Sequence, residues 1–226
     1  MNPMSGILGE TWRMYRTYAR HLLTIAFVVY VVAALLEALL AGTLGRLGAL
    51  LSLIVGIIAA SLLQAALVKA VEDVRDGRAD MSLGATLQAA RPSVGRVAVA
   101  SILAGIAIGL GLILFIAPGL FLLTIWCLIV PVLVLEGVSI GASFGRSRQL
   151  VRGFGWQVFG PLVAVFLVLI VGDIVIGLSL ASLPDALRRI LSGLISGTLV
   201  APFLALVVTL AYFRLLSAQN SATGHG

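Results

Sequence analysis

Long apolar stretches alternate with short charged ones along the chain, and this alternation is its dominant pattern. Most of the apolar stretches are close to 20 residues, the length at which an α-helix crosses the roughly 30 Å hydrocarbon core of a bilayer. We therefore predict an all-α, polytopic membrane protein that forms a single integral membrane domain over residues 1–226. The six predicted transmembrane helices, arranged in three hairpins, are 22–40, 47–67, 97–117, 120–135, 158–178 and 190–210.

The third and fourth predicted helices come from one apolar stretch that is too long for a single span. Pro118 and Gly119 supply a turn near its middle, so we predict a tight hairpin there. Pro131 lies inside the second arm of that hairpin, and its missing N–H predicts a kink. The fourth helix is accordingly expected to be short and bent.

The composition excludes an ordinary soluble domain. Of 226 residues, 61% are hydrophobic and 11% are charged, whereas soluble domains are about half apolar and a quarter charged. The net charge of +6 would indicate nucleic acid only as a soluble basic patch, and here the basic residues flank apolar stretches. Cys127 is the single cysteine, which excludes an intrachain disulfide. We expect the lipid bilayer as the partner and no nucleic acid.

The distribution of Lys and Arg predicts the orientation, because cytoplasmic connections retain these residues during insertion. Of the 15 basic residues, only Arg46, Arg188 and Arg189 fall in connections on one side. The others gather on the opposite side, with the N-terminus, the two long loops and the C-terminus. We therefore predict a cell (inner) membrane protein with both termini in the cytoplasm.

Each predicted hairpin is preceded by an amphipathic segment on the cytoplasmic side. In the first, Trp12, Tyr15 and Tyr18 fall on one face of a helix and the arginines on the other, which is typical of a helix lying in the membrane interface. The alternative is a helix packed on another part of the protein. The predicted interfacial helices are 5–20, 82–91 and 139–152. The predicted contacts with anionic phospholipid headgroups are Arg13, Arg16, Arg20, Arg146, Arg148 and Arg152.

Two of these segments resemble one another, which indicates an internal repeat. Residues 82–87 read SLGATL and residues 139–144 read SIGASF, and at the same offset Arg91 matches Arg148. Each unit would be a surface helix with a Ser N-cap, followed by a hairpin. Chance similarity in a chain rich in Ala, Gly and Leu is the alternative.

The central third of the chain resembles the membrane domain found in glycerophosphoryl diester phosphodiesterases and in stand-alone relatives. The resemblance is carried by Pro118-Gly119, Trp126, Pro131, Glu136-Gly137, the run from Arg146 to Gly153, and Trp156, with Asp76-Gly77-Arg78 as a weaker signal. It implies an all-helical, multi-pass domain. It does not imply the phosphodiesterase activity, because the enzymes carry their metal-binding carboxylates and catalytic histidines in a separate soluble barrel.

The residues themselves also favour a protein that is not an enzyme. The histidines are His21, beside the first predicted span, and His225, in a polar tail, so a histidine acid–base pair is not expected. The acidic residues of the second loop alternate with basic ones, a pattern that fits a solvated helix end better than a metal site. No cofactor and no metal are predicted.

Two carboxylates inside apolar stretches require an explanation, because ionisable groups in hydrocarbon are costly. Glu37 and Asp173 lie 15 residues beyond the start of their stretches, so both are expected roughly 22 Å from the inner boundary. One hypothesis is a shared vestibule on a polar path for a proton, a cation or an amine. The alternative is pairing near the outer interface, with partners among Arg46, Arg188 and Arg189.

Other residues are assigned structural roles. Glu136 ends the fourth predicted helix, and we predict that it pairs with Arg148 at the interface and sets the angle between span and surface helix. The spacing of Gly105 with Gly109, and of Gly193 with Gly197, predicts close helix packing within the bundle.

Together these features predict a non-catalytic inner-membrane protein that interacts with lipid, organises the membrane or anchors a membrane or cytoplasmic protein partner. A small transporter or channel that uses Glu37 and Asp173 is the alternative.

Overall fold

Helices make up nearly the whole of the structure, a computed structural model. It describes the backbone of residues 3–75 and 80–223 and, except at 41–46, 185–186, 189 and 222–223, their side chains. Within these ranges there are no strands, and six stretches are long and apolar enough to cross a membrane. The elements are α1 (Ile7–Thr17), α2 (Ala19–Arg75), α3 (Leu83–Ala90), η1 (Arg91–Ser93), α4 (Val94–Leu114), α5 (Ile116–Trp126), α6 (Ile129–Pro131), η2 (Val132–Glu136), α7 (Ile140–Val151), α8 (Gly155–Ser179) and α9 (Asp185–Thr223).

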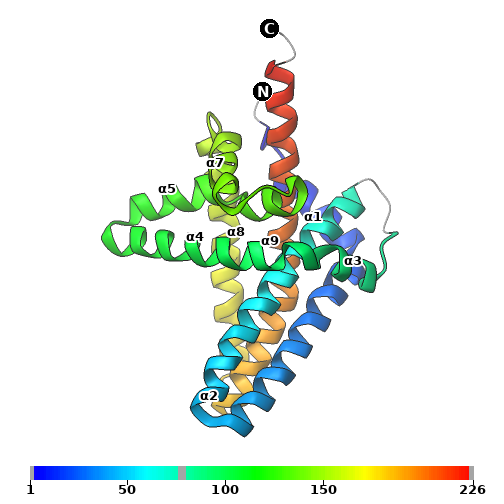
Figure 1. The fold of residues 1–226 in the computed structure, drawn as a ribbon, viewed down its shortest axis with the longest axis vertical. Coiled ribbons are helices and arrows are strands. Elements are labelled where there is room, and N and C mark those ends of the chain that lie inside the picture. The colour runs from blue at the N-terminus through cyan, green and yellow to red at the C-terminus, as the bar shows by residue number, and fades with distance from the viewer. Residues whose placement is uncertain (1–2, 76–79, 224–226) are drawn as a thin grey trace.

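The long element α2 contains the first two predicted spans. Its first arm, Ala19–Leu40, and its second arm, Leu47–Arg75, lie side by side and meet at the lower end of Figure 1. Ser52 Oγ donates a hydrogen bond to the carbonyl oxygen of Glu37 at 3.2 Å across the two arms. The second arm and α9 continue beyond the predicted ends at 67 and 210, because charged residues end a span without ending a helix.

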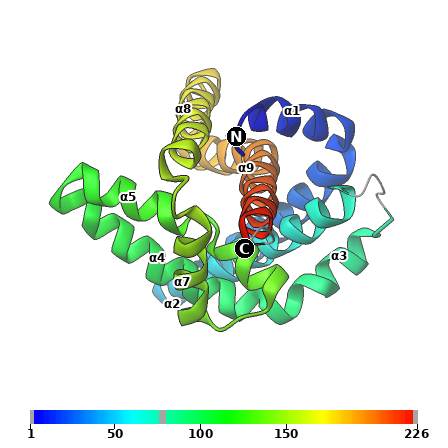
Figure 2. The ribbon, with the colours of Figure 1, turned by 90° about the horizontal axis from the view of Figure 1, so that it is seen from above.

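The α4–α5 pair differs most from the expected six-helix bundle. Both arms of α2, α8 and α9 run along the long axis of the molecule, whereas α4 and α5 lie side by side across that axis (Figure 1). From above, α9 is central and the α4–α5 pair points away from it (Figure 2). A helix of 11 residues such as α5 is only about 16 Å long, which is too short to cross the hydrocarbon core unaided.

The turn between α4 and α5 lies at Phe115 and not at the predicted Pro118-Gly119. Phe115 is extended, with φ −156° and ψ 140°, and α5 begins at Ile116. Pro118 therefore occupies the first turn of α5, where its missing N–H costs no intrahelical hydrogen bond. Gly119 lies against the end of α4: a Cβ there would be 2.6 Å from the Leu112 nitrogen.

The predicted fourth helix is interrupted and not merely kinked. Ordinary α-helix ends at Trp126, residues 127 and 128 form a turn, and the chain resumes as α6 and then as the π-helix η2. Pro131 follows the break by one turn, and its ring removes the N–H that would pair with the carbonyl of Cys127. Gly137, with φ 67°, then ends the segment in the left-handed region that favours glycine.

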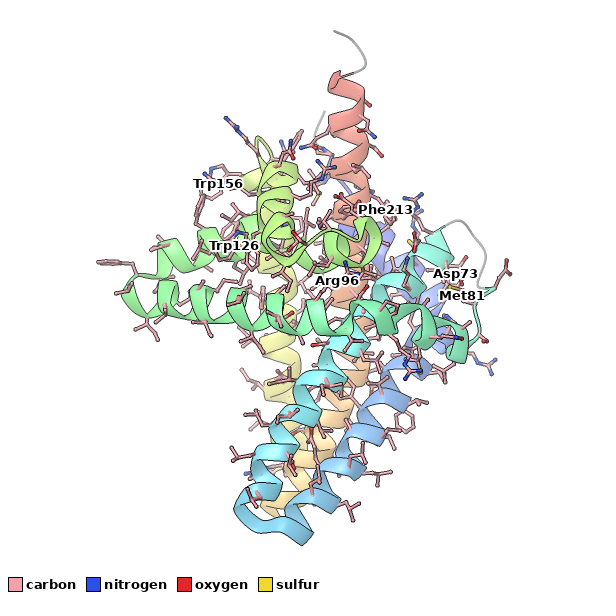
Figure 3. The ribbon with its side chains drawn as sticks, viewed as in Figure 1. Asp73, Met81, Arg96, Trp126, Trp156 and Phe213 are labelled. Carbon is pink, nitrogen blue, oxygen red and sulfur yellow. The ribbon has the colours of Figure 1, made fainter. Side chains whose placement is uncertain are left out.

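Both predicted Ser N-caps are confirmed. Ser82 and Ser139 adopt nearly the same extended conformation, and their side chains accept hydrogen bonds from the Ala85 and Ala142 nitrogens at 3.2 and 3.4 Å. The segment that leads into α3 contacts the second arm of α2: the Met81 nitrogen donates a hydrogen bond to Asp73 Oδ2 at 3.1 Å (Figure 3).

Buried side chains concentrate at one end of the bundle. Two apolar cores lie there, one where both arms of α2 meet η2 and α9, and one where α1, α7 and α8 meet α9. The opposite halves of α2 and α8 instead expose large apolar side chains, including Leu35, Leu50, Val168 and Leu178. A surface of this kind is stable in hydrocarbon and not in water.

Candidate functional site

Glu136 is the centre of a polar cluster that joins three elements. Its carboxylate oxygens each lie 3.1 Å from Arg146 Nε on α7, and Tyr212 on α9 donates its hydroxyl to Oε1 at 2.9 Å. We call these three residues the Glu136 junction. Arg148 was the predicted partner of Glu136, but Arg146 forms the ion pair instead. At about 100° per residue, a helix cannot present positions 146 and 148 to the same neighbour.

Two further side chains, Arg96 and Gln149, form hydrogen bonds next to the Glu136 junction. Arg96 on α4 donates from Nη1 to the carbonyls of Gly137 and Val138, at 2.6 and 3.2 Å, where α4 crosses the bundle (Figure 3). Arg146 Nη1 also donates to Gln149 Oε1 at 3.2 Å. Arg146 was among the predicted lipid contacts, and the structure shows it engaged with the protein.

Ser147 forms hydrogen bonds with two backbone groups at the break between α5 and α6. Its hydroxyl donates to the carbonyl of Ile125 at 2.7 Å and accepts from the Leu128 nitrogen at 3.3 Å, and the residue is fully buried. Sequence reasoning did not identify this role. The signal was the interruption near Pro131, which leaves backbone groups that need a partner from another element.

Arg148 and Arg152 lie in a cleft beside the Glu136 junction. The cleft has a volume of about 550 Å³ and is lined by α5, α7 and the start of α8, and its lining includes Phe121 and Ile125 as well as the two exposed arginines. We call it the arginine cleft. Next to it Trp156 is 86% exposed at the start of α8 (Figure 3). The first turn of α8 has no side-chain cap, so its N–H groups add positive potential.

Helix α1 carries exposed arginines on one face and packs on α9 with the other. Tyr15 donates its hydroxyl to the Leu199 carbonyl at 2.9 Å, and burial raises the pKa of this phenol above its ordinary value. The Trp12 and Tyr15 rings both contact Phe203, at centroid distances of 6.4 and 5.7 Å. The aromatic face is thus partly covered by protein. The exposed arginines of this segment are Arg13, Arg16 and Arg20.

Arg214 fastens the N-terminal segment to α9. Its guanidinium donates to the carbonyls of Pro3 and Ser5, at 3.0 and 2.8 Å, and forms an ion pair with Glu10 on α1. In the sequence, Arg214 is one of the basic residues that predict the cytoplasmic side. A basic residue at the end of a span thus also holds the neighbouring surface helix.

The two intramembrane carboxylates lie in adjoining pockets. Glu37 lines one of about 660 Å³ with Ser52 and Gly56, and Asp173 lines one of about 530 Å³ and accepts a hydrogen bond from Ser196 Oγ. The pockets share part of their walls. Where the hypothesis had one shared vestibule, the structure has two neighbouring pockets. The residues common to both are Tyr30, Ala60, Leu63 and Gly193.

Several predicted partners and motif residues lie outside the described part of the chain. They are the side chains of Arg46 and Arg189, the run Asp76-Gly77-Arg78, and His225. Within the residues that the structure describes, no three His, Cys, Asp or Glu side chains are grouped as a metal site would require. No family model, no curated protein and no solved structure matches the chain.

Proposed function

We propose that this chain is a non-catalytic, multi-pass protein of the cell inner membrane that binds anionic phospholipid on its cytoplasmic side and organises the surrounding leaflet. The observation that carries the proposal is the arginine cleft. Arg148 and Arg152 provide two exposed cations, and Phe121 and Ile125 on α5 contribute apolar lining to the same cleft. A phospholipid has the matching chemistry, because its phosphate is an acceptor for guanidinium groups and its acyl chains are apolar.

The distribution of the other surface features supports the same orientation. Helix α1 and the C-terminal part of α9 lie at one end of the molecule, opposite the reversal of α2 (Figure 1). The arginine cleft and the exposed Arg13, Arg16 and Arg20 belong to that end. The basic end would face the anionic inner leaflet, where each Lys or Arg near the surface contributes about 1 kcal/mol.

The α4–α5 pair fits the proposal as an element of the leaflet itself. Large apolar side chains are exposed along both helices and around the turn, including Ile106, Ile113 and Phe115. In Figure 1 the pair lies at about the level of α1 and α3. We infer that it is embedded along the inner leaflet, where it displaces acyl chains beside the arginine cleft.

The test is lipid retention by the full chain. An Arg148→Gln/Arg152→Gln variant purified from a phosphatidylglycerol-containing membrane is expected to retain about tenfold less of that lipid, measured by mass spectrometry. Arg91→Gln is the matched control, because Arg91 is exposed and does not line the cleft. Equal retention by all three proteins would contradict the proposal.

A second candidate function is a small transporter or channel for a proton, a cation or an amine. The specific observation in its favour is the shared wall between the Glu37 and Asp173 pockets, which brings two acidic side chains into adjoining spaces within the spans. Ionisable residues inside a membrane are commonly part of a transport route.

Flux into liposomes that contain a trapped pH-sensitive dye tests this candidate. Asp173→Asn and Glu37→Gln are each expected to abolish the dye response to an imposed proton or methylamine gradient. Asp80→Asn is the control, because Asp80 is exposed in the segment before α3. A wild-type response no larger than that of empty liposomes would exclude transport of these ions.

A further inference from the structure

The Asp173 pocket contains more polar groups than the surrounding protein satisfies. It lies between both arms of α2, the break before α6, α8 and α9, and most of its wall is apolar. We call it the intramembrane pocket. Its polar lining residues are Tyr30, Gln64, Asp173, Ser196 and Thr209.

Thr209 is the clearest unsatisfied group. Several hydroxyls in the described helices donate to the carbonyl four residues earlier, as Ser61 does to Ile57 at 2.8 Å and Thr124 to Leu120 at 2.8 Å. Thr209 is fully buried, and its Oγ1 has no hydrogen-bond partner in the described structure. Buried hydroxyls are normally paired. Thr209 lies 13 residues beyond Ser196 on α9, about 20 Å along the helix axis, so this unmet polar group is at the end of the pocket away from Asp173.

Asp173 sets the charge of that occupant. Ser196 donates to one carboxylate oxygen, and no described cation pairs with the other. Tyr30 and Gln64 add a phenol and an amide that can accept hydrogen bonds, again without a partner among the described residues. An ammonium group meets this set, because it carries the opposite charge and several N–H donors.

The pocket opens toward the lipid. Gln64 on the second arm of α2 and Asp173 on α8 are exposed, and apolar side chains beside Asp173, such as Val171 and Ile174, are exposed as well. The ligand would therefore arrive from the bilayer, with its polar head in the pocket and its apolar tail among the acyl chains.

We propose that the intramembrane pocket binds an amphiphile with a primary ammonium head and an aliphatic tail. Asp173 forms the charge-assisted hydrogen bond, and Gln64 and Tyr30 accept the remaining donors. The proposal goes beyond the arginine cleft and rests on the second candidate function only for the choice of site. It requires binding and not flux.

The test measures thermal unfolding of the full chain in dodecyl maltoside with dodecylamine or, as the uncharged comparison, dodecanol. Dodecylamine is expected to raise the Tm of the wild-type protein in a saturable way, because a ligand of the native state stabilises it. Dodecanol at equal concentration is expected to raise it less. Asp173→Asn is expected to weaken dodecylamine binding about tenfold or more.

Two glycine variants distinguish binding in the pocket from nonspecific effects of the amphiphile on stability. A Cβ on Gly197 would lie 2.4 Å from Tyr30 Cζ, so Gly197→Ala must displace the phenol and is expected to weaken binding. Gly177→Ala is the matched control, because a Cβ there meets nothing within 4 Å. Gln64→Leu, at an exposed position of the second arm of α2, keeps the bulk of the side chain and removes one polar contact of the site.

The outcomes are distinct from those of the functional proposals. Equal shifts with dodecanol, or unchanged dodecylamine affinity in Asp173→Asn and Gln64→Leu, would overturn the ammonium site. Binding without flux would remove the transport candidate and leave the site intact. Loss of phosphatidylglycerol retention in the Arg148→Gln/Arg152→Gln variant tests the arginine cleft, and it tests neither the ammonium site nor transport.

Discussion

Arg146 lies against Glu136, with its Nε 3.1 Å from both carboxylate oxygens, although the two residues belong to different elements. Their side chains are 29% and 21% exposed, so water screens the pair only in part. Tyr212 approaches the same carboxylate from α9. The pair therefore links η2 to α7, the helix that carries Arg148 of the arginine cleft.

Removing the cation should leave Glu136 partly buried with only Tyr212 as a donor. Arg146→Met is expected to lower the free energy of unfolding in micelles by about 1–3 kcal/mol, because an uncompensated charge then remains at the junction. Arg148→Met, two residues along the same helix, is the control and should change it by less than about 0.5 kcal/mol. Equal losses in both variants would show that the ion pair contributes no more than a surface arginine.

Ser147 provides a second test of how the interrupted segment is stabilised. Ser147→Ala removes the groups that serve the Ile125 carbonyl and the Leu128 N–H, and is expected to cost about 1–3 kcal/mol. Hydrogen exchange at the Leu128 amide should become faster. Ser143→Ala is the control, because Ser143 is equally buried but donates only to Ile140 within its own helix, at 2.6 Å. An unchanged Leu128 exchange rate would mean that the bridge is dispensable.

The α4–α5 turn depends on a close backbone approach. A Cβ on Gly111 would lie 3.0 Å from the Gly119 Cα, and one on Gly119 would lie 2.4 Å from Leu112 Cγ. Gly119→Ala is therefore expected to destabilise the protein by about 1–3 kcal/mol through overpacking. Gly109→Ala should be neutral or slightly stabilising, because a Cβ there meets nothing within 4 Å and Ala favours helix. Thermal unfolding of the two variants provides the comparison, and equal Tm values would contradict the close approach.

The features that could be predicted from the sequence depend on interactions between neighbouring residues or on whether a stretch is stable in hydrocarbon. The apolar stretches indicated six potential spans because their length and composition suit hydrocarbon directly. The N-caps at Ser82 and Ser139 were predictable because a cap involves only the next three residues. Neither inference needs to know which helices are neighbours.

The remaining features depend on tertiary contacts. Pro118 suggested a turn, but a helix accepts proline in its first turn, so the true turn at Phe115 carried no local signal. Of the two pairs with GxxxG spacing, Gly105 and Gly109 have open space where a Cβ would lie, whereas Gly197 of the second pair packs closely against Tyr30. The close contact of Gly111 with Gly119 across the turn has no such spacing. The choice of Arg146 over Arg148 as the partner of Glu136 depends on the rotation of α7 about its own axis.

The exposed arginines of α1 and of the start of α2 allow the lipid proposal to be tested away from the cleft. Tyr15 and the Glu10–Arg214 pair hold α1 on α9 in any membrane. Arg13, Arg16 and Arg20 are exposed, so they would add affinity only where the leaflet is anionic. Amide exchange in α1 should accordingly be slower in phosphatidylglycerol nanodiscs than in phosphatidylcholine nanodiscs, and high salt should remove the difference.

Replacing all three arginines by glutamine should abolish that difference, because about 1 kcal/mol per residue is lost at an anionic surface. Exchange in phosphatidylcholine should stay at the wild-type rate, since the contacts with α9 are kept. Tyr15→Phe should do the opposite: it removes the hydrogen bond to Leu199 and should speed exchange equally in both lipids. If the triple variant instead exchanged faster in both lipids, the arginines would be supporting the packing of α1 on α9 and not its contact with headgroups.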